Sequence, residues 1–390
     1  MMDKYASLRA NWSYPTAVRF GPGRIAELPE ALLTAGIRKP LFVTDPGLVS
    51  LPIVARTLDI LKKADVAHAV FSKVDGNPTL KNVEDGLAVY KAGGHDGVIV
   101  FGGGSAMDAG KVIAFMSGQT RPVFDFEDRE DWWTRADPKG IAPIVAVPTT
   151  AGTGSEVGRA GVITDPADHV KKIIFHPLML PKVVISDPEL TFDLPARITA
   201  WTGMDALSHC LEAYCSPFFH PLGEGIALEG LRLCKEWLPV AVKDGKNLEA
   251  RAFMLAASSM GAIAFQKGLG GMHSMAHPLS GLRGTHHGLT IAVVMPYVLQ
   301  HNLPVLTERL TALARYLDLP NPSAEAVVHW IVGLRKELGI PHTLKEIGVG
   351  EDVVEQAAPM AENDPSTGGN PIALKAADYA LLYRRAINGN

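Results

Sequence analysis

One segment constrains the fold more than any other: Val98-Ile-Val-Phe-Gly-Gly-Gly-Ser-Ala-Met-Asp-Ala-Gly-Lys111. Its apolar start is typical of a buried strand, which runs into the turn Gly102-Gly-Gly-Ser105 and then into a predicted helix. Such a turn lets backbone N–H groups approach a pyrophosphate, while the helix N-terminus supplies a partial positive charge. Because Met107 stands at the sixth position, the segment departs from G-x-G-x-x-G, and a turn needed only for tight packing is the alternative. The candidate pyrophosphate-binding residues are Gly102, Gly103, Gly104 and Ser105.

Short apolar runs alternate with amphipathic stretches on both sides of this segment. The expected strands cover residues 40–45, 67–71, 97–101, 144–147 and 183–186. The expected helices cover residues 53–64, 83–92 and 106–116. This alternation is typical of an α/β domain with a mostly parallel sheet.

The pattern changes at Pro188-Glu-Leu-Thr-Phe-Asp-Leu-Pro195, and from Arg197 onward long helical stretches dominate. They are expected at residues 203–214, 223–237 and 248–264. A chain of 390 residues also exceeds the size at which one hydrophobic core stops growing. We therefore expect an α/β dinucleotide-binding domain at residues 1–190 and an all-α domain at residues 191–390.

The composition excludes several classes of function. The formal net charge is -4 and the chain has no long Lys/Arg run, which argues against nucleic acid or an anionic membrane surface as a partner. The amino terminus, Met1-Met-Asp-Lys-Tyr5, lacks the apolar core of a signal peptide, and no uninterrupted apolar run approaches the roughly 20 residues of a membrane span. Three cysteines without a C-x-x-C pair give little support to disulfides or a thiolate zinc site. We expect a cytoplasmic protein that acts on a small molecule.

Two further segments are suited to a dinucleotide. The run Pro148-Thr-Thr-Ala-Gly-Thr-Gly-Ser-Glu156 follows an expected strand and offers hydroxyls and amides to ribose and phosphates. Asp45, at the end of an early strand, could accept hydrogen bonds from a ribose hydroxyl and repel a 2′-phosphate, which favours NAD over NADP. Taken alone, Asp45 before Pro46-Gly47 is an ordinary turn residue.

The second half of the chain contains two pairs of potential metal ligands. Asp205 and His209 are four residues apart in a helical pattern, as are His273 and His277, and His287 follows a glycine-bounded break. Side chains four apart project from one helix face, so each pair offers two groups to one point, although an isolated pair is more often ordinary surface. Imidazoles and one carboxylate suit Fe(II), Zn(II), Mn(II) or Co(II). A cation with an open position could bind an alcohol oxygen and lower its pKa while hydride leaves carbon.

Taken together, these motifs resemble the iron-containing (group III) alcohol dehydrogenase family, which shares its architecture with glycerol dehydrogenases and dehydroquinate synthases. The resemblance covers nearly the whole chain. Its motifs are Gly21-Pro-Gly23, Gly76-Asn-Pro-Thr79, Gly102 to Lys111, Pro148 to Val157, Asp187-Pro-Glu-Leu190, Gly203 to His209, His273 to Leu279 and His287-Gly288.

The resemblance implies a role for each candidate residue. Asp205, His209, His273 and His287 would bind a catalytic divalent metal, Fe(II) or alternatively Zn(II), and His277 would lie near the nicotinamide and could help to relay a proton. The cofactor would be NAD, with Gly102 to Ser105 on the pyrophosphate and with Asp45, Asp108, Thr149, Thr150 and Lys171 lining its site. One departure is His286, which stands where many members have proline. This spare imidazole has no implied role, but it could be an alternative ligand or a substrate contact.

We therefore expect an NAD-linked, metal-dependent alcohol dehydrogenase or aldehyde reductase that assembles as a dimer or larger homo-oligomer. Its substrate would be a primary alcohol or a hydroxy acid, and Arg159, Arg283 and Lys267 are candidate partners for a substrate carboxylate. One alternative is a metal lyase or cyclase of the dehydroquinate synthase kind, which would need a basic phosphate pocket. Another is a metal-free NAD-binding protein.

Overall fold

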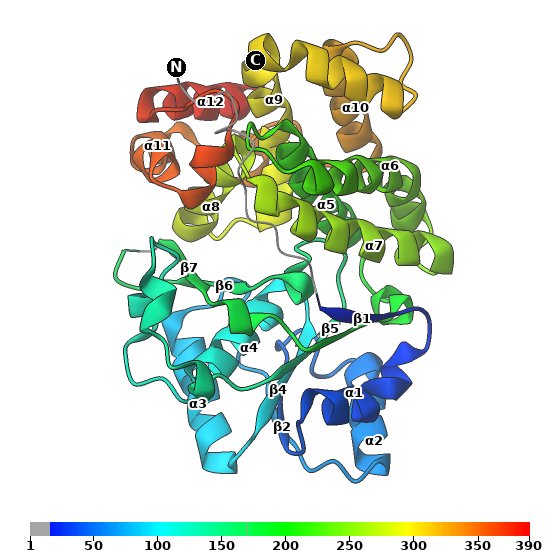
Figure 1. Ribbon diagram of the computed structural model, residues 1–390. Coiled ribbons are helices and arrows are strands. Elements are labelled where there is room, and N and C mark those ends of the chain that lie inside the picture. Colours follow the sequence, from blue (N-terminus) through cyan, green and yellow to red (C-terminus); the bar gives the residue numbers. More distant parts are fainter. Residues whose placement is uncertain (1–15, 169) are drawn as a thin grey trace, which may run out of the picture. The chain divides into compact units, whose positions relative to one another are not determined.

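The computed structural model describes residues 16–168 and 170–390, which form two compact units (Figure 1). The first unit ends at Leu194 and the second begins at Pro195, close to the boundary expected at residues 190 and 191. The amino terminus Met1–Tyr5, on which the expectation about a signal peptide rests, lies outside the described residues.

The first unit is built on a parallel sheet with strand order β1-β8-β5-β4-β2-β3. Its strands are β1 (Ala17–Phe20), β2 (Pro40–Val43), β3 (Ala69–Phe71), β4 (Gly97–Gly102), β5 (Ile144–Pro148) and β8 (Val183–Ser186). Its α-helices are α1 (Leu28–Ala35), α2 (Pro52–Lys63), α3 (Leu80–Gly93) and α4 (Gly104–Met116). The central strands β2, β4 and β5 are buried along their whole length, which explains their unbroken apolar sequence.

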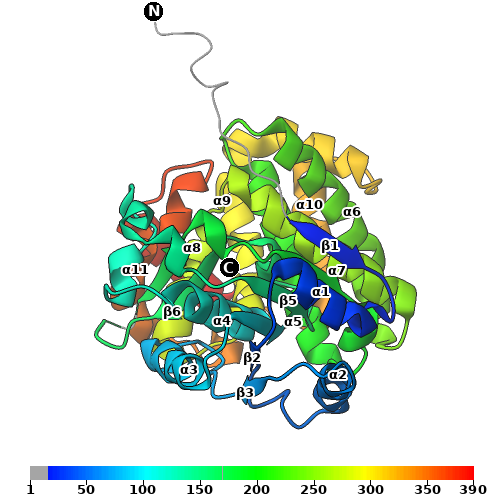
Figure 2. The same cartoon turned by 60° about the horizontal axis from the view of Figure 1, so that its bottom comes forward.

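Helices cover both faces of this sheet. Phe42 and Ile99 belong to the apolar core that α1 and α2 close on one face. Val100 faces the other way, where Gly110 lets α4 pack directly on the strand because any side chain there would overlap it. Figures 1 and 2 both show α2 and α3 on opposite sides of β2. The predicted α/β architecture is confirmed.

Several elements are additional to those expected. The strand β1 and the helix α1 precede the first predicted strand, and an antiparallel hairpin of β6 (Ala160–Thr164) and β7 (Lys171–Phe175) follows the loop after β5. Each of these strands is only four or five residues long and carries polar or small residues among its apolar ones, so its pattern is weak. Gly161 of β6 lies against the backbone of Asp108, which attaches the hairpin to α4.

The second unit is helical throughout its described residues, as predicted. Its α-helices are α5 (Ala196–Cys215), α6 (Pro221–Lys243), α7 (Leu248–Ala264), α8 (Gly271–Arg283), α9 (His287–Tyr316), α10 (Ala324–Glu337), α11 (Val354–Glu362) and α12 (Ala376–Asn388). Helix α5 begins directly after Pro195 and not at Gly203, because Thr199 and Ala200 continue its buried face toward the N-terminus. All three cysteines are buried and form no disulfide bond in the described part of the chain.

Two helical segments of this unit are long and apolar enough to cross a membrane by length and composition alone. They are Leu248–Lys267 and α9. In the most apolar 18-residue stretch of each, 50% and 67% respectively is buried inside the protein. Core helices of a folded unit have the same character, so this feature does not by itself indicate a membrane span.

A buried arginine lies against α9 near a proline inside that helix. Pro296 has no N–H with which to bond the carbonyl of Ala292. Arg335 of α10, only 2% exposed, donates from Nη1 to the carbonyl oxygens of Val293 at 2.8 Å and Ala292 at 3.5 Å. The arginine therefore donates to the carbonyl of Ala292, which the proline leaves without a helical partner, and also to the neighbouring carbonyl of Val293.

Replacing this arginine should destabilise the helical unit. We expect Arg335→Met, which preserves the apolar stem, to lower the free energy of unfolding by about 1–3 kcal/mol because buried carbonyls lose their donor. Urea titration followed by circular dichroism measures the change. Arg384→Met is the matched control, since Arg384 is partly exposed and pairs with the exposed Glu355, and we expect an effect within about 0.5 kcal/mol. Equal midpoints for Arg335→Met and the wild type would contradict this role.

Candidate metal and cofactor sites

The glycine turn between β4 and α4 is shaped for close approach of the backbone. Gly102 has a φ of 152°, and a Cβ placed on it would stand 2.7 Å from the Cβ of Ala106. A Cβ on Gly104 would stand 2.6 Å from Cγ2 of Thr153. The Ser105 hydroxyl donates to the carbonyl oxygen of Gly76 at 2.6 Å, which joins the turn to another of the expected motifs. The three glycines therefore add no side chains of their own at the N-terminus of α4, which favours close approach of an anion to its backbone N–H groups.

The loop after β5 lies beside this turn. The N–H of Thr149 donates to the carbonyl oxygen of Gly102 at 3.0 Å, and a Cβ on Gly103 would lie 3.2 Å from Oγ1 of Thr150. The hydroxyl of Thr149 is buried and has no hydrogen-bond partner among residues 16–168 and 170–390. The predicted pair Thr149 and Thr150 therefore joins the glycine turn at the carboxyl ends of two neighbouring strands, where open α/β sheets bind ligands.

Asp108 and Lys111 hold that loop against α4. One carboxylate oxygen of Asp108 accepts from the Ser155 hydroxyl at 2.6 Å, and the other accepts from the N–H of Val162 at 3.1 Å. The buried ammonium of Lys111 donates to the carbonyl oxygen of Ser155 at 2.9 Å, and burial lowers its pKa despite the nearby Asp108 carboxylate. Asp108 thus lies at the base of the predicted cofactor loop, with both carboxylate oxygens engaged by the protein itself.

Asp45 lies next to the glycine turn, whereas Lys171 belongs to the hairpin. The Oδ1 atom of Asp45 accepts from the N–H groups of Gly47 and Leu48 at 2.9 and 3.0 Å, and Oδ2 stands 3.4 Å from a Cβ placed on Gly102. Burial raises the pKa of Asp45, although these two hydrogen bonds oppose the shift. Lys171 is the first residue of β7 and pairs in register with Thr164.

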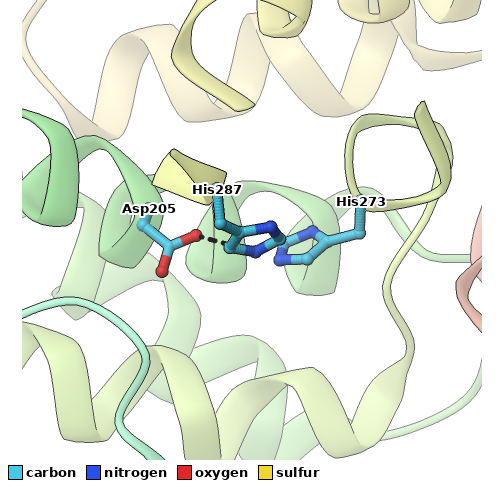
Figure 3. A group of neighbouring side chains, drawn as sticks. All are labelled: Asp205, His273 and His287. Carbon is cyan, nitrogen blue, oxygen red and sulfur yellow. Dashed lines mark ion pairs between the residues drawn. The ribbon is translucent and has the colours of Figure 1, made fainter. Parts of the chain in front are cut away.

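Three of the four predicted metal ligands converge in the helical unit (Figure 3), and His209 lies next to them. Ligand atoms of Asp205, His273 and His287 all lie within 4.8 Å of one another. The Nε2 atom of His287 is 3.5 Å from Oδ1 of Asp205. His209, one turn after Asp205 on α5, places Nε2 4.0 Å from the same oxygen and its ring centroid 4.8 Å from that of His273. Helices α5, α8 and α9 each supply part of this group.

Two glycines allow α9 and α7 to pack closely against α5, the helix that carries Asp205 and His209. A Cβ on Gly288 would overlap the carbonyl oxygen of Trp201, so the start of α9 packs directly on the backbone of α5. A Cβ on Gly261 of α7 would stand 2.9 Å from the Cβ of His209. Bare backbone at Gly288 lets His287 reach Asp205, and bare backbone at Gly261 leaves room for His209 beside α7.

The donor set fits a divalent cation. Oδ1 of Asp205 and Nε2 of His273 are buried, and neither has a hydrogen-bond partner within the described part of the chain. Buried polar atoms are rarely left in this state, and a metal ion would satisfy both. Burial raises the pKa of Cys210 and Cys215 on α5 to about 12, so these thiols remain protonated. Nitrogen and oxygen donors without thiolate are compatible with Fe(II) and Zn(II).

His277 and His286 lie beside this group without belonging to it. The ring of His277 stacks on that of His287 at a centroid distance of 5.2 Å and an angle of 12°. The exposed His286 lies with its ring centroid 4.8 Å from that of Trp201. The spare imidazole therefore packs on a neighbouring aromatic ring, and the three-residue ligand group does not include it.

Two buried carboxylates were not among the expected residues. Oε2 of Glu212 lies 2.5 Å from Nδ1 of His273, and Oδ2 of Asp364 lies 2.8 Å from Nδ1 of His277. Burial is the largest single influence on the pKa of His273 and lowers it, but Glu212 together with neighbouring carboxylates outweighs burial and leaves the pKa raised. Burial is likewise the largest single influence on the pKa of Asp364 and raises it, but His277 together with the hydrogen bonds from Ser366 leaves the pKa lowered. Glu212 could have been noticed because it follows His209 by three residues on one helix face, whereas nothing in the sequence links Asp364 to His277.

The three candidate partners for a substrate carboxylate differ in their surroundings. Lys267 is buried and donates to the carbonyl oxygens of Tyr214 and Ser216 at the end of α5, so it serves the fold. Arg283 pairs with Asp352. Arg159 lies over the ring of Phe175. Of the three, Lys267 is the least suited to bind a substrate.

Known proteins resemble this chain along nearly its full length. The family model described as iron-containing alcohol dehydrogenase matches residues 15–188, and its C-terminal counterpart matches residues 199–387. A 4-hydroxybutyrate dehydrogenase from Cupriavidus necator is 39% identical over 96% of this chain and 99% of that protein. The crystal structure of a 1,3-propanediol oxidoreductase is 37% identical and has a TM-score of 0.92, covering 97% of this chain and all of that one.

A third similar protein was solved with the cofactor. It is a sulfoacetaldehyde reductase from Bifidobacterium kashiwanohense in complex with NAD⁺, 28% identical with a TM-score of 0.87, covering 98% of this chain and all of that one. The curated relatives are dehydrogenases, which does not favour the lyase or metal-free alternatives. Family models that match both units, together with a relative 39% identical over almost the whole length, show that the chain belongs to the iron-containing alcohol dehydrogenase family, whose members use NAD and a divalent metal, typically iron.

Proposed function

We propose that this protein transfers hydride between NAD and a primary alcohol or hydroxy acid, with a divalent cation held by Asp205, His209, His273 and His287. The observation that carries the proposal is the convergence within 4.8 Å of oxygen and nitrogen donors from α5, α8 and α9, two of them buried and that of His287 half-buried. We assign the cofactor to the α/β unit, residues 1–190, and the cation to the helical unit, residues 191–390.

The site residues have separate tasks in this reaction. A bound divalent cation supplies Lewis acidity, which lowers the pKa of an alcohol hydroxyl. The Asp205 carboxylate supplies the negative charge of the ligand set, and the three imidazoles complete it. His277 stands outside the set with Nδ1 facing Asp364, so Nε2 is the atom at which it would exchange a proton.

The residues around the glycine turn would bind NAD. The turn Gly102 to Ser105 and the N-terminus of α4 would bind the pyrophosphate, Thr149 and Thr150 would contact the cofactor, and Asp108 would support their loop. Lys171 would approach the cofactor from the hairpin. Asp45 would accept from the adenosine ribose and exclude a 2′-phosphate.

The choice between NAD and NADP tests the role of Asp45. In Asp45→Asn the amide oxygen can still accept from Gly47 and Leu48, but the charge that repels a 2′-phosphate is lost. We expect kcat/KM for NADP to rise by about tenfold or more. Steady-state kinetics with both cofactors measures it. Asp59→Asn, which removes a surface carboxylate of α2, should leave the ratio of kcat/KM for NADP to kcat/KM for NAD unchanged. If Asp45→Asn also left this ratio unchanged, the role assigned to Asp45 would be refuted.

The substrate class can be tested by a screen. The metal-stripped protein is reloaded with Fe(II) or Zn(II) and supplied with NAD⁺ and a panel of short primary alcohols, diols and 4-hydroxy acids, while NADH absorbance is followed. The relative that acts on 4-hydroxybutyrate and the exposed Arg283 support including the acids. We expect turnover with at least one member of the panel. Absence of turnover with every alcohol after metal loading would contradict the proposed function.

We further propose a cytoplasmic homo-oligomer, dimeric or larger. Light scattering on the purified protein would give its size in solution. A monomer at micromolar concentration would rule out the oligomer.

A further inference from the structure

The helix α8 carries two imidazoles one turn apart, and each has its Nδ1 against a buried carboxylate. His273 faces Glu212 of α5 at 2.5 Å, and His277 faces Asp364, which follows α11, at 2.8 Å. The two pairs are chemically alike, but only His273 belongs to the group of ligand atoms that converge with Asp205 and His287. Because only one of the two histidines is a ligand, the effect of a carboxylate beside a metal ligand can be compared with that of a similar carboxylate beside a histidine that does not bind the metal.

Glu212 uses its two oxygens for two different tasks. Oε1 accepts from the N–H of Met272 at 2.7 Å, in the first turn of α8, and Oε2 is directed at Nδ1 of His273. The Glu212 side chain is only 5% exposed, and its helix also carries Asp205 and His209. A single side chain thus fixes both the backbone and the ring of the residue pair Met272-His273 relative to two other ligands.

This contact defines which ring nitrogen of His273 is available. A carboxylate can only accept, so Nδ1 carries the proton in this pair. The lone pair then lies on Nε2, which is the buried atom without a hydrogen-bond partner among the described residues. An imidazole whose distal N–H donates to a carboxylate is also a more basic ligand.

We infer that Glu212 is a positioning residue that holds His273 as the Nδ1–H tautomer, with Nε2 directed at the cation, and thereby sets the affinity of the site for a divalent metal. The inference rests on the metal site of the proposed function, because it needs His273 to be a ligand. Asp364 has no such effect, since its partner His277 is not one.

The test is a measurement of metal affinity, not of activity. The full-length protein is stripped of metal, and its affinity for Zn(II) is determined by competition with a chromophoric chelator. We expect Glu212→Gln to weaken Zn(II) binding by about 10- to 100-fold, the usual effect of losing such a carboxylate. The glutamine oxygen can still accept from Met272, so the fold of α8 is preserved. Asp364→Asn removes an equivalent charge from His277 and should change the affinity by less than about twofold.

Two further variants distinguish the possible failures. If His273→Ala binds Zn(II) as tightly as the wild type, the proposed metal site itself is wrong. If His273→Ala loses affinity while Glu212→Gln keeps it, the site stands and the inference about Glu212 is overturned. In the double variant, Glu212→Gln should add no weakening beyond that of His273→Ala, and a fully additive loss would show that Glu212 does not act through His273.

A shorter carboxylate provides a second test if Glu212→Gln does not fold. Glu212→Asp keeps the charge but withdraws it from Nδ1 by one methylene. We expect weaker Zn(II) binding in this variant as well, and wild-type affinity would overturn the inference.

Discussion

Replacing His287 with alanine is expected to remove the metal and to lower kcat by about 10³-fold or more, because several kcal/mol of Lewis-acid stabilisation disappear with the cation. His287 is the ligand that α9 contributes to the group, and its Nε2 lies 3.5 Å from Oδ1 of Asp205. Elemental analysis of the purified variant and NADH production after reloading with Fe(II) or Zn(II) measure the two effects.

The neighbouring histidine is the matched control for this variant. His286→Ala removes an imidazole one residue away that packs on Trp201 and lies outside the ligand group. We expect it to retain the metal and most of the activity. If His286→Ala lost the metal and His287→Ala retained it, the metal ligand would be His286 and not His287.

The second large effect should come from a residue that has no side chain. Gly288→Ala would place a methyl group over the carbonyl oxygen of Trp201 and 3.0 Å from its carbonyl carbon. These are backbone atoms of α5, so they cannot rotate away as a side chain would. The start of α9 must move outward, and His287 moves away from Asp205. We expect metal affinity to fall by about 100-fold or more, together with a loss of about 1–3 kcal/mol of stability from overpacking.

Gly333 provides the comparison for Gly288. It lies within α10, and a Cβ placed on it would meet nothing within 4 Å. Gly333→Ala should leave metal affinity unchanged and stabilise the helix by about 0.5–1 kcal/mol, since alanine loses less backbone entropy. Zn(II) competition and thermal unfolding of both variants measure the contrast. If Gly288→Ala bound Zn(II) as the wild type does, close packing of α9 on α5 would not be what positions His287.

The sequence indicated much of the fold because the strongest elements carry local signals. The buried strands around Gly102 and the long helices after Pro195 follow from apolar runs and glycine or proline breaks. The β6–β7 hairpin was not expected because its short, mixed strands depend on packing against α4. Local patterns cannot report contacts of that kind.

In the candidate site, too, some residues have a local signal in the sequence and others are revealed only by packing. Asp205 with His209 and His273 with His277 are visible as pairs at helical spacing, but spacing treats the members of a pair equally. The family resemblance gave the two histidines different roles, and the packing of α5, α8 and α9 supplies a physical reason, because His273 belongs to the converging ligand group while His277 stacks beside it. The pairing of His277 with Asp364, on a separate segment of the chain, has no signal in the sequence at all.

The most direct measurement is an anomalous difference map from crystals of the protein soaked in Fe(II) or Zn(II). We predict one strong peak in the helical unit, bonded at about 2.0–2.2 Å to Asp205, His209, His273 and His287, with His277 and His286 outside the coordination shell. A peak bonded to His277 or His286 in place of one of these ligands would contradict the site, and so would a fully soaked crystal with no metal between α5, α8 and α9.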